Sequence, residues 1–139
     1  MAVLKPSRGA AFGDYDDDGD VDILVANCND SPTLLRNDGG NQGHWLRLKT
    51  QGVVSNRDGI GARIRVVAGN LAQIREVKSG SSLYSQNDLR VSFGLGRRNR
   101  VDRIEVRWPS GRADTLVDLA ADQSLTIREG VGLVKAPER

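Results

Sequence analysis

Cysteine, histidine and aromatic residues are scarce in this chain, and each scarcity narrows what the protein can be. Cys28 is the single cysteine, so the chain cannot form an internal disulfide and the fold must be stable without one. His44 is the single histidine, so any catalytic arrangement that needs a histidine would have to use this residue. Aromatic residues make up 4% of the chain, which leaves few stacking surfaces for nucleic-acid bases.

Long apolar runs are also missing. No stretch approaches the roughly 18–20 apolar residues that a helix needs to cross a bilayer, so we expect no membrane span. The first residues, MAVLKPSRGAAFGDYD, lack the apolar core of a secretory signal peptide. We therefore expect either a protein that stays inside the cell or a piece of a longer exported protein.

The charge of the chain is unevenly distributed. Residues 1–40 carry a net charge of −5, whereas residues 41–139 carry +7. Such asymmetry predicts an acidic N-terminal piece and a basic C-terminal piece. With 139 residues there is room for one domain with a proper core and a small appended piece. We divide the chain into a segment at 1–40, a domain at 41–130 and a tail at 131–139, with GNQGH (40–44) as the joint.

Apolar residues recur with period two, which indicates strands. Alternating runs at 62–66, 102–108 and 125–127 are separated by turn signals such as Gly69-Asn70 and Pro109-Ser110-Gly111. GARIRVVAGNLAQIREV (61–77) is typical of a hairpin, because Gly-Asn suits a tight turn. LVDLAAD (116–122) is the one segment that also fits a short helix. The pattern predicts an all-β fold, an antiparallel sandwich or barrel, with sixteen glycines supplying turns.

The strand predicted at 22–27 differs from the others because its apolar residues are continuous. Ile23-Leu24-Val25-Ala26 is typical of a strand that is covered on both faces. Forty residues cannot supply that cover alone. We expect it from the basic domain, from a second copy of the chain in a homo-oligomer, or from repeats outside this sequence.

The stretch DYDDDGDVD (14–22) holds six aspartates in nine positions, and such crowding opposes folding unless a cation neutralises it. Alternate side chains of a curled loop converge on one point, and a glycine at the sixth position permits the sharp turn. We expect a calcium ion held by side chains at positions one, three, five and nine and by the backbone carbonyl at position seven. The side chains of Asp17 and Asp20 are expected to point outward. The predicted metal residues are Asp14, Asp16, Asp18, Asp20 and Asp22.

An EF-hand does not fit this loop. Position twelve of an EF-hand is a bidentate glutamate, and here it is Val25, within the apolar run. No amphipathic helix flanks the loop on either side. The motif has the shorter form D-x-D-x-D-G-x-x-D and leads directly into a strand.

Two stretches of the sequence resemble known families. GAAFGDYDDDGDVDILVAN, followed by LLRND, resembles the FG-GAP (VCBS-type) repeat, a calcium-binding blade unit of β-propellers. Four later stretches are similar to the ASPIC/UnbV domain: SNRDGIGARI, REVKSGSSLYSQND, VSFGLG and VDRIEVRWPSG. GSSLYSQND departs from that family's pattern, which has an additional glycine and the opposite order of leucine and tyrosine.

The resemblance implies a partial propeller blade followed by an ASPIC/UnbV-type β domain. It also implies calcium as the cofactor, no catalysis, an extracellular or cell-surface location, and a role in adhesion, in matrix association or in interaction with a protein or carbohydrate ligand.

Two other function classes compete with this interpretation. A polyanion or nucleic-acid surface could be built on Arg97, Arg98 and Arg100, in keeping with a pI near 9.0. A hydrolase would need a polar cleft with perturbed titratable groups, and the chain offers few outside the aspartates. Asp58, in the turn-rich SNRDG, is a further candidate for a ligand or second metal contact. His44 is expected in packing or at the surface rather than in catalysis.

Overall fold

The computed structural model describes residues 5–134, with the side chain of Asn41 left out of the description. These residues form eleven strands and one short 3-10 turn, η1 (Gly40–Gln42). The all-β prediction is confirmed. None of the described residues belongs to a helix long and apolar enough to cross a membrane.

The chain divides into two compact units. The first runs to Asn41 and also takes in Ser79–Asp88, while the second contains Gln42–Lys78 and the chain from Leu89 onward. The boundary falls within the predicted joint at 40–44. The segment Ser79–Asp88, which the sequence division placed in the 41–130 domain, belongs instead to the first unit.

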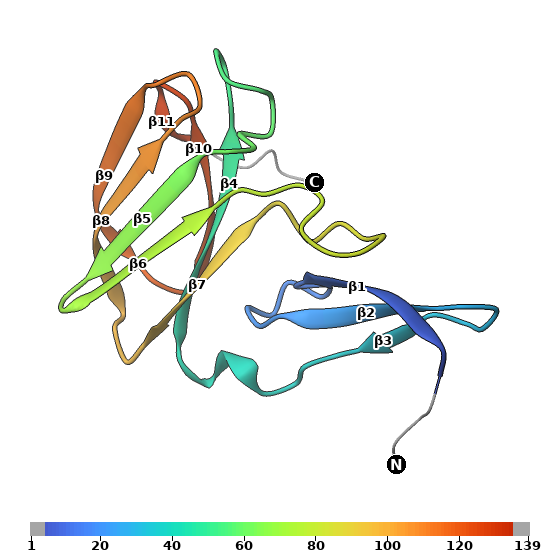
Figure 1. Cartoon of the computed structure of the whole chain (residues 1–139). Helices are drawn as coiled ribbons and strands as arrows, with labels where there is room; N and C mark the ends of the chain where they lie inside the picture. The colour runs from blue at the N-terminus through green and yellow to red at the C-terminus, as the bar shows by residue number, and fades with distance from the viewer. Residues whose placement is uncertain (1–4, 135–139) are drawn as a thin grey trace. The chain divides into compact units, whose positions relative to one another are not determined.

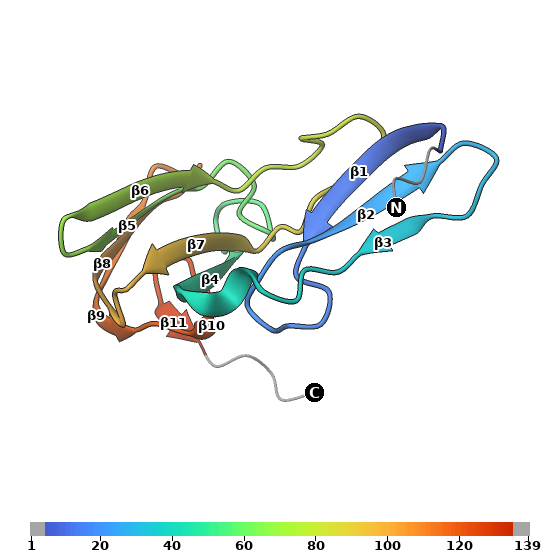
Figure 2. The ribbon, with the colours of Figure 1, turned by 90° about the horizontal axis from the view of Figure 1, so that it is seen from below.

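The first unit is a three-stranded antiparallel sheet with the order β1-β2-β3 (Figures 1 and 2). Its middle strand is the predicted continuous apolar strand. Leu24 in that strand is 47% exposed and pairs with Leu34, which is 44% exposed. The apolar run is therefore only partly covered by the described residues. The strands are β1 (Ser7–Gly13), β2 (Asp22–Asn27) and β3 (Thr33–Leu35).

The second unit is a sandwich of two four-stranded sheets, which Figure 1 shows in green to red. The sheet orders are β11-β10-β4-β7 and β6-β5-β8-β9, and the described residues do not close them into a barrel. The strands are β4 (His44–Gln51), β5 (Arg63–Ala68), β6 (Leu71–Glu76), β7 (Val91–Gly96), β8 (Arg100–Arg107), β9 (Ala113–Ala120), β10 (Gln123–Arg128) and β11 (Gly132–Val134).

The inward faces of both sheets supply a single core. Leu46 and Leu48 of β4, Phe93 of β7 and Ile104 of β8 are completely buried, and Ile64 of β5 joins them. On β5 and β8 the core positions alternate with outward or half-buried polar residues, as the period-two pattern predicted. β4 departs from this pattern, because Arg47 between Leu46 and Leu48 is itself only 1% exposed. Burying an aliphatic side chain of this size contributes about 1.5–3 kcal/mol to stability, so this core accounts for a disulfide-free fold.

Three details of the second unit differ from the sequence expectations. β4 and β10 pair in parallel, so the sandwich is not purely antiparallel. LVDLAAD forms the end of strand β9 and a turn, because its backbone pairs with β8 over residues 113–120. Of the predicted tail, residues 132–134 form β11, while residues 135–139 lie outside the described part of the chain. The hairpin of β5 and β6 is confirmed, with Gly69 at φ 58° in its turn.

Candidate metal centre

The aspartate loop connects β1 to β2 and is closed by the cross-strand pair of Gly13 and Asp22. Two residues within it adopt left-handed backbone angles: Asp17 at φ 59° and Gly19 at φ 103°. Glycine reaches this region without steric cost, and aspartate tolerates it better than most side chains. These two turns curl the loop tightly, as the glycine at position six predicted.

The curl gathers three carboxylates. One side-chain oxygen from each of Asp14, Asp16 and Asp18 lies within 4.8 Å of the other two. Asp14 is buried at 5% exposure, whereas Asp16 and Asp18 are exposed. Two unit negative charges about 5 Å apart repel by about 0.8 kcal/mol in bulk water, and by about 3 kcal/mol at an effective dielectric constant of ~20. A cation at this point would turn that repulsion into attraction.

Backbone groups of the loop orient these carboxylates. The N–H of Gly19 donates to Oδ2 of Asp14 at 2.8 Å, and the N–H of Asp20 donates to Oδ1 of Asp18 at 3.1 Å. Arg36 approaches from β3's end, with its Nη1 3.9 Å from Oδ2 of Asp16. The loop is thus pre-shaped by its own hydrogen bonds.

Asp20 lies differently from the sequence expectation. Its side chain was expected to point outward, but the residue is only 5% exposed and its Oδ2 accepts a hydrogen bond of 2.9 Å from the N–H of Gly40. Gly40 permits this approach because a Cβ there would lie 2.9 Å from Cβ of Asp20. The other oxygen, Oδ1, is buried with no hydrogen-bond partner among the described residues. A buried carboxylate oxygen in that state fits an oxygen-seeking cation.

Asp22 closes the loop with both of its carboxylate oxygens. Oδ1 accepts from the N–H of Asn37 and Oδ2 accepts from the N–H of Tyr15, each at 2.8 Å. The hydrogen bond from Asn37, followed by that from Tyr15, holds the pKa of Asp22 below its usual value despite the opposing effect of burial. Of the five predicted metal residues, the structure therefore brings three together at one point, and gives Asp20 and Asp22 bonds to neighbouring backbone.

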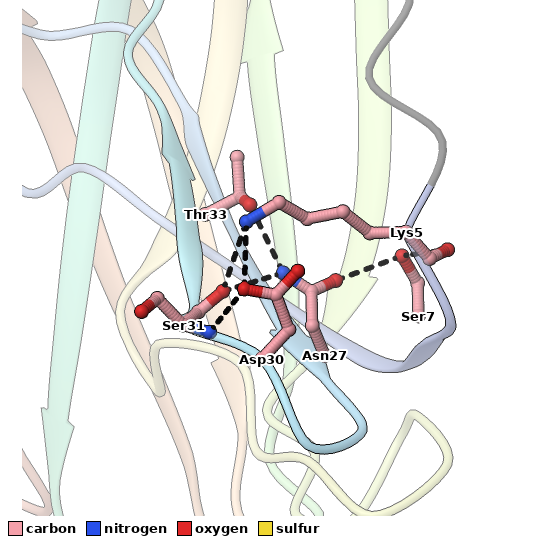
Figure 3. Close-up of polar contacts among 6 residues, drawn as sticks. All are labelled: Lys5, Ser7, Asn27, Asp30, Ser31 and Thr33. Carbon is pink, nitrogen blue, oxygen red and sulfur yellow. Dashed lines mark hydrogen bonds and ion pairs between the residues drawn. The ribbon is translucent and has the colours of Figure 1, made fainter.

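A second polar cluster lies at the opposite end of the same sheet, where β2 leads to β3 (Figure 3). Lys5 lies 3.3 Å from Oδ1 of Asp30, and the amide of Asn27 donates to the Ser31 carbonyl at 2.7 Å and to Oγ1 of Thr33 at 3.0 Å. This cluster contains its own cation, the lysine ammonium. It holds the β2–β3 turn closed.

The other predicted ligand residues do not form one site. Arg98 donates to Oδ1 of Asn70 at 2.5 Å, and Arg100 forms an ion pair with Asp118. Both arginines therefore connect loops and strands of the second unit, and their guanidinium groups already have partners within the protein. The side chain of Arg97 forms no hydrogen bond or ion pair with the described residues. Asp58 contacts the neighbouring Arg57 at 3.5 Å, and no further acidic residue gathers with it in the described chain.

His44 forms a polar contact at the surface, as expected. Its Nδ1 lies 2.7 Å from Oδ2 of Asp122, whose Oδ1 accepts from the N–H of Trp45 at 3.1 Å. The hydrogen bond with His44 is the largest cause that holds the pKa of Asp122 below its usual value. The pair joins the start of β4 to the turn before β10.

Two functional-looking features were missed by the sequence reasoning. The first is Glu129, which is 1% exposed and whose Oε2 accepts hydrogen bonds from the N–H groups of Val53, Val54 and Ser55. Burial raises its pKa, but hydrogen bonds, led by that from the Ser110 hydroxyl, outweigh this effect and lower the pKa to about 2. A lone glutamate after a strand carries no sequence signal for such a role.

The second missed feature is a groove of about 300 Å³ within the first unit. Its walls are mostly apolar and come from all three strands, from the metal loop and from the Ser79–Asp88 segment. The sequence carries no direct signal for it, because the groove joins segments that are far apart along the chain. The lining residues are Ala11, Phe12, Gly13, Asp14, Tyr15, Asp22, Leu24, Leu34, Gln86 and Asp88.

Comparison with known proteins agrees with the later part of the sequence analysis. The family model described as ASPIC and UnbV matches residues 52–134. Cartilage acidic protein 1 of Mus musculus is 30% identical over 120 residues, covering 79% of this chain and 18% of that protein. The Homo sapiens protein is 29% identical over 120 residues, covering 79% of this chain and 17% of that protein. The chain therefore spans less than a fifth of the length of these curated relatives. The FG-GAP likeness of the first unit stays a prediction.

Proposed function

This chain belongs to the ASPIC and UnbV family, and from that premise we propose that it is a non-catalytic calcium-binding β module. The observation that carries the proposal is the convergence of Asp14, Asp16 and Asp18 within 4.8 Å. The buried, unsatisfied Oδ1 of Asp20 supports it as a further oxygen at the same loop. A bound cation would supply positive charge to this acidic loop, and no reaction is assigned to it.

Calcium suits this donor set better than other divalent ions. All donors are oxygens, which hard cations prefer, and the loop is short and irregular. Magnesium demands near-ideal octahedral geometry and gives up its water reluctantly, whereas calcium accepts six to eight oxygens in flexible arrangements. The residues that would hold the ion are Asp14, Asp16 and Asp18, with Asp20 near them. The sequence analysis also placed Asp22 in this set.

We propose no catalysis, because two of the carboxylates with lowered pKa values serve the fold. Asp22 and Glu129 both have lowered pKa values, and both accept hydrogen bonds from backbone N–H groups that close loops. A catalytic acid or base would instead face a cleft with at least one oxygen directed at a substrate. In Asp22 both oxygens are already engaged.

We further propose that the first unit is part of a larger β assembly, as the FG-GAP resemblance implies. Its sheet has three strands and exposes apolar side chains on both faces, such as Leu24 at 47% and Leu35 at 51%. Further blades of a longer chain, or a second copy in a homo-oligomer, would cover them. Sedimentation of the isolated chain should therefore show self-association, and a strictly monomeric chain at high concentration would leave only the first option.

An extracellular or cell-surface location, with a role in adhesion to a protein or carbohydrate ligand, follows from the same resemblance. The name of the matched relatives refers to cartilage, a tissue made largely of extracellular matrix. Extracellular calcium modules work at dissociation constants of about 10⁻⁴–10⁻³ M.

Calorimetric titration with calcium tests the metal site. We expect binding to the unmodified chain, with affinity lowered at least tenfold in Asp16→Asn and Asp18→Asn because each loses a negative ligand. Asp17→Asn is the matched control: it removes the same charge at an exposed position with φ 59°, which asparagine also tolerates. If Asp17→Asn weakened binding as much as the two ligand variants, the overall negative charge of the loop would explain the binding, and the assignment of Asp16 and Asp18 as ligands would be wrong.

A further inference from the structure

The outer face of the β6-β5-β8-β9 sheet carries arginines in a regular arrangement. On β5 the core residues Ile64 and Val66 alternate with outward Arg63 and Arg65. The neighbouring strand β8 likewise directs Arg103, Glu105 and Arg107 away from the core, and the register places Arg63 opposite Arg107 and Arg65 opposite Glu105. Four arginines and one glutamate therefore share the middle of this face.

The charges of this face are only partly compensated. Glu105 lies 3.2 Å from Arg65 and 2.8 Å from Arg103, so a single carboxylate serves both of these arginines. The side chains of Arg63 and Arg107 form no hydrogen bond or ion pair with any described residue, although Glu76 stands opposite Arg63 in the register of β6. Like charges directly opposite one another destabilise a sheet. The repulsion between Arg63 and Arg107 therefore lowers the stability of the sheet, and a bound anionic group would relieve it.

A groove of about 290 Å³ lies at this position. Its walls are formed by Arg63, Arg65, Ile74, Glu105 and Arg107. Ile74 is 58% exposed and supplies an apolar patch beside the guanidinium groups. The groove thus combines two uncompensated positive charges, one apolar side chain and one negative charge.

We propose that this groove binds an acidic peptide segment of a partner protein. Arg63 and Arg107 receive a carboxylate of the segment, because guanidinium groups match carboxylates with paired N–H donors. A neighbouring aliphatic side chain of the segment packs on Ile74. Spaced carboxylates can avoid Glu105, whereas the closely spaced charges of a sulfated glycan or a nucleic acid would be repelled by it. The lining also contains no aromatic side chain on which a base or a sugar could stack.

This surface differs from the one that the sequence suggested. The run at 97–100 pointed to an anion site, but Arg98 and Arg100 are engaged with Asn70 and Asp118. The groove instead uses arginines that are far apart in sequence and adjacent across two strands. Its occupation does not depend on the metal centre, which lies in the other unit.

A titration followed by amide and arginine side-chain NMR signals tests the proposal, with a soluble peptide of repeated Glu-Ala-Val units as the probe. We expect the signals of Arg63 and Arg107 to shift, and affinity to fall about tenfold when either is changed to alanine, the loss of one charge-assisted pair. The Gln-Ala-Val peptide should not bind. Arg57→Ala is the control, since its side chain is 88% exposed on a loop of the same unit.

Three results would overturn the proposal. One is the absence of any shift at millimolar acidic peptide, and another is a set of shifts confined to residues 97–100. The third is binding of heparin or a single-stranded oligonucleotide through Arg63 and Arg107 more tightly than the peptide. That result would assign the groove to a dense polyanion instead. All the substituted arginines are exposed, so the variants keep the buried core intact.

Discussion

Asn87 holds the backbone of Phe12: its Oδ1 accepts a hydrogen bond of 3.0 Å from the Phe12 N–H. The next residue, Asp88, donates its own N–H to the Phe12 carbonyl at 2.9 Å. Strand β1 is an edge of the three-stranded sheet, and an uncovered edge invites pairing with other chains. A segment that comes from between strands of the second unit therefore covers this edge. The chain crosses between its two units at 41–42, 78–79 and 88–89.

Removing the Asn87 side chain should weaken the attachment of the Ser79–Asp88 segment to strand β1. We expect Asn87→Ala to lower the free energy of opening of the Phe12 amide by about 1 kcal/mol, the net value of one hydrogen bond. Hydrogen exchange measured at the Phe12 amide checks this. Asn87→Asp keeps an acceptor oxygen and should retain most of the protection. Unchanged protection in the alanine variant would show that the segment does not hold β1 in solution.

A side chain at Gly9 should displace the same segment. A Cβ at this position would lie 2.8 Å from the backbone carbonyl oxygen of Leu83, which cannot swing aside as a flexible side chain can. We expect Gly9→Ala to destabilise the first unit by about 1–3 kcal/mol, the usual range for overpacking. Gly94→Ala is the control, because nothing lies within 4 Å of its added Cβ. Urea denaturation compares the two, and equal stabilities would contradict the close approach.

Because of Glu129, we expect the stability of the fold to fall at acid pH. Its folded pKa of about 2 lies below its ordinary value of 4.5, so its contribution to stability is fully present above pH 4.5. That contribution is lost as the pH falls from 4.5 through about 2, because the protonated carboxyl no longer accepts all of its hydrogen bonds. Stability measured by denaturant at several pH values in this window should fall steeply.

The matching variant is Glu129→Gln. We expect it to be less stable than the unmodified chain at pH 7, because the amide has one acceptor oxygen where the carboxylate has two and lacks the negative charge that strengthens these hydrogen bonds. Its stability should also vary less between pH 4.5 and 2. Glu76→Gln, at an exposed position of β6, serves as the control and should leave the acid response unchanged. An equally steep acid response in the Glu129→Gln variant would assign the effect to other carboxylates.

Calcium should raise the thermal stability of the chain. An ion at 100 times its dissociation constant adds about 2.7 kcal/mol by mass action. For a chain of this size we expect a rise in melting temperature of roughly 5–10 °C. Magnesium at the same concentration should raise it much less. Melting curves recorded in calcium, in magnesium and in a chelator check this, and coincident curves would argue against a bound ion.

The sequence predicted those features that depend on neighbouring residues. The convergence of Asp14, Asp16 and Asp18 follows from their alternation within one curled loop, and the hairpin at 63–76 follows from alternation around Gly69. The outward direction predicted for Asp20 was wrong because the orientation of this side chain depends on Gly40, which is 20 residues further along the chain, after strands β2 and β3. Spacing along the chain carries no information about such a partner.

Features that join distant segments could not be predicted in this way. Strands β4 and β10 pair in parallel although they are more than 70 residues apart in the sequence. The hydrogen bonds from the 53–55 loop to Glu129 span a similar separation. The cover of β1 by Ser79–Asp88 is of the same kind. The run at Arg97–Arg100 left an anion-binding surface open as an alternative, because the sequence shows charge but not the partners of each side chain. In the structure Arg98 donates a hydrogen bond to Asn70, and Arg100 donates one to Asp118.

The most direct test of the account is diffraction from crystals grown in calcium, recorded where calcium scatters anomalously. We predict one anomalous peak in the β1–β2 loop, about 2.3–2.6 Å from oxygens of Asp14, Asp16 and Asp18. A map with no peak there, and with these three carboxylates directed into bulk solvent at saturating calcium, would contradict the account.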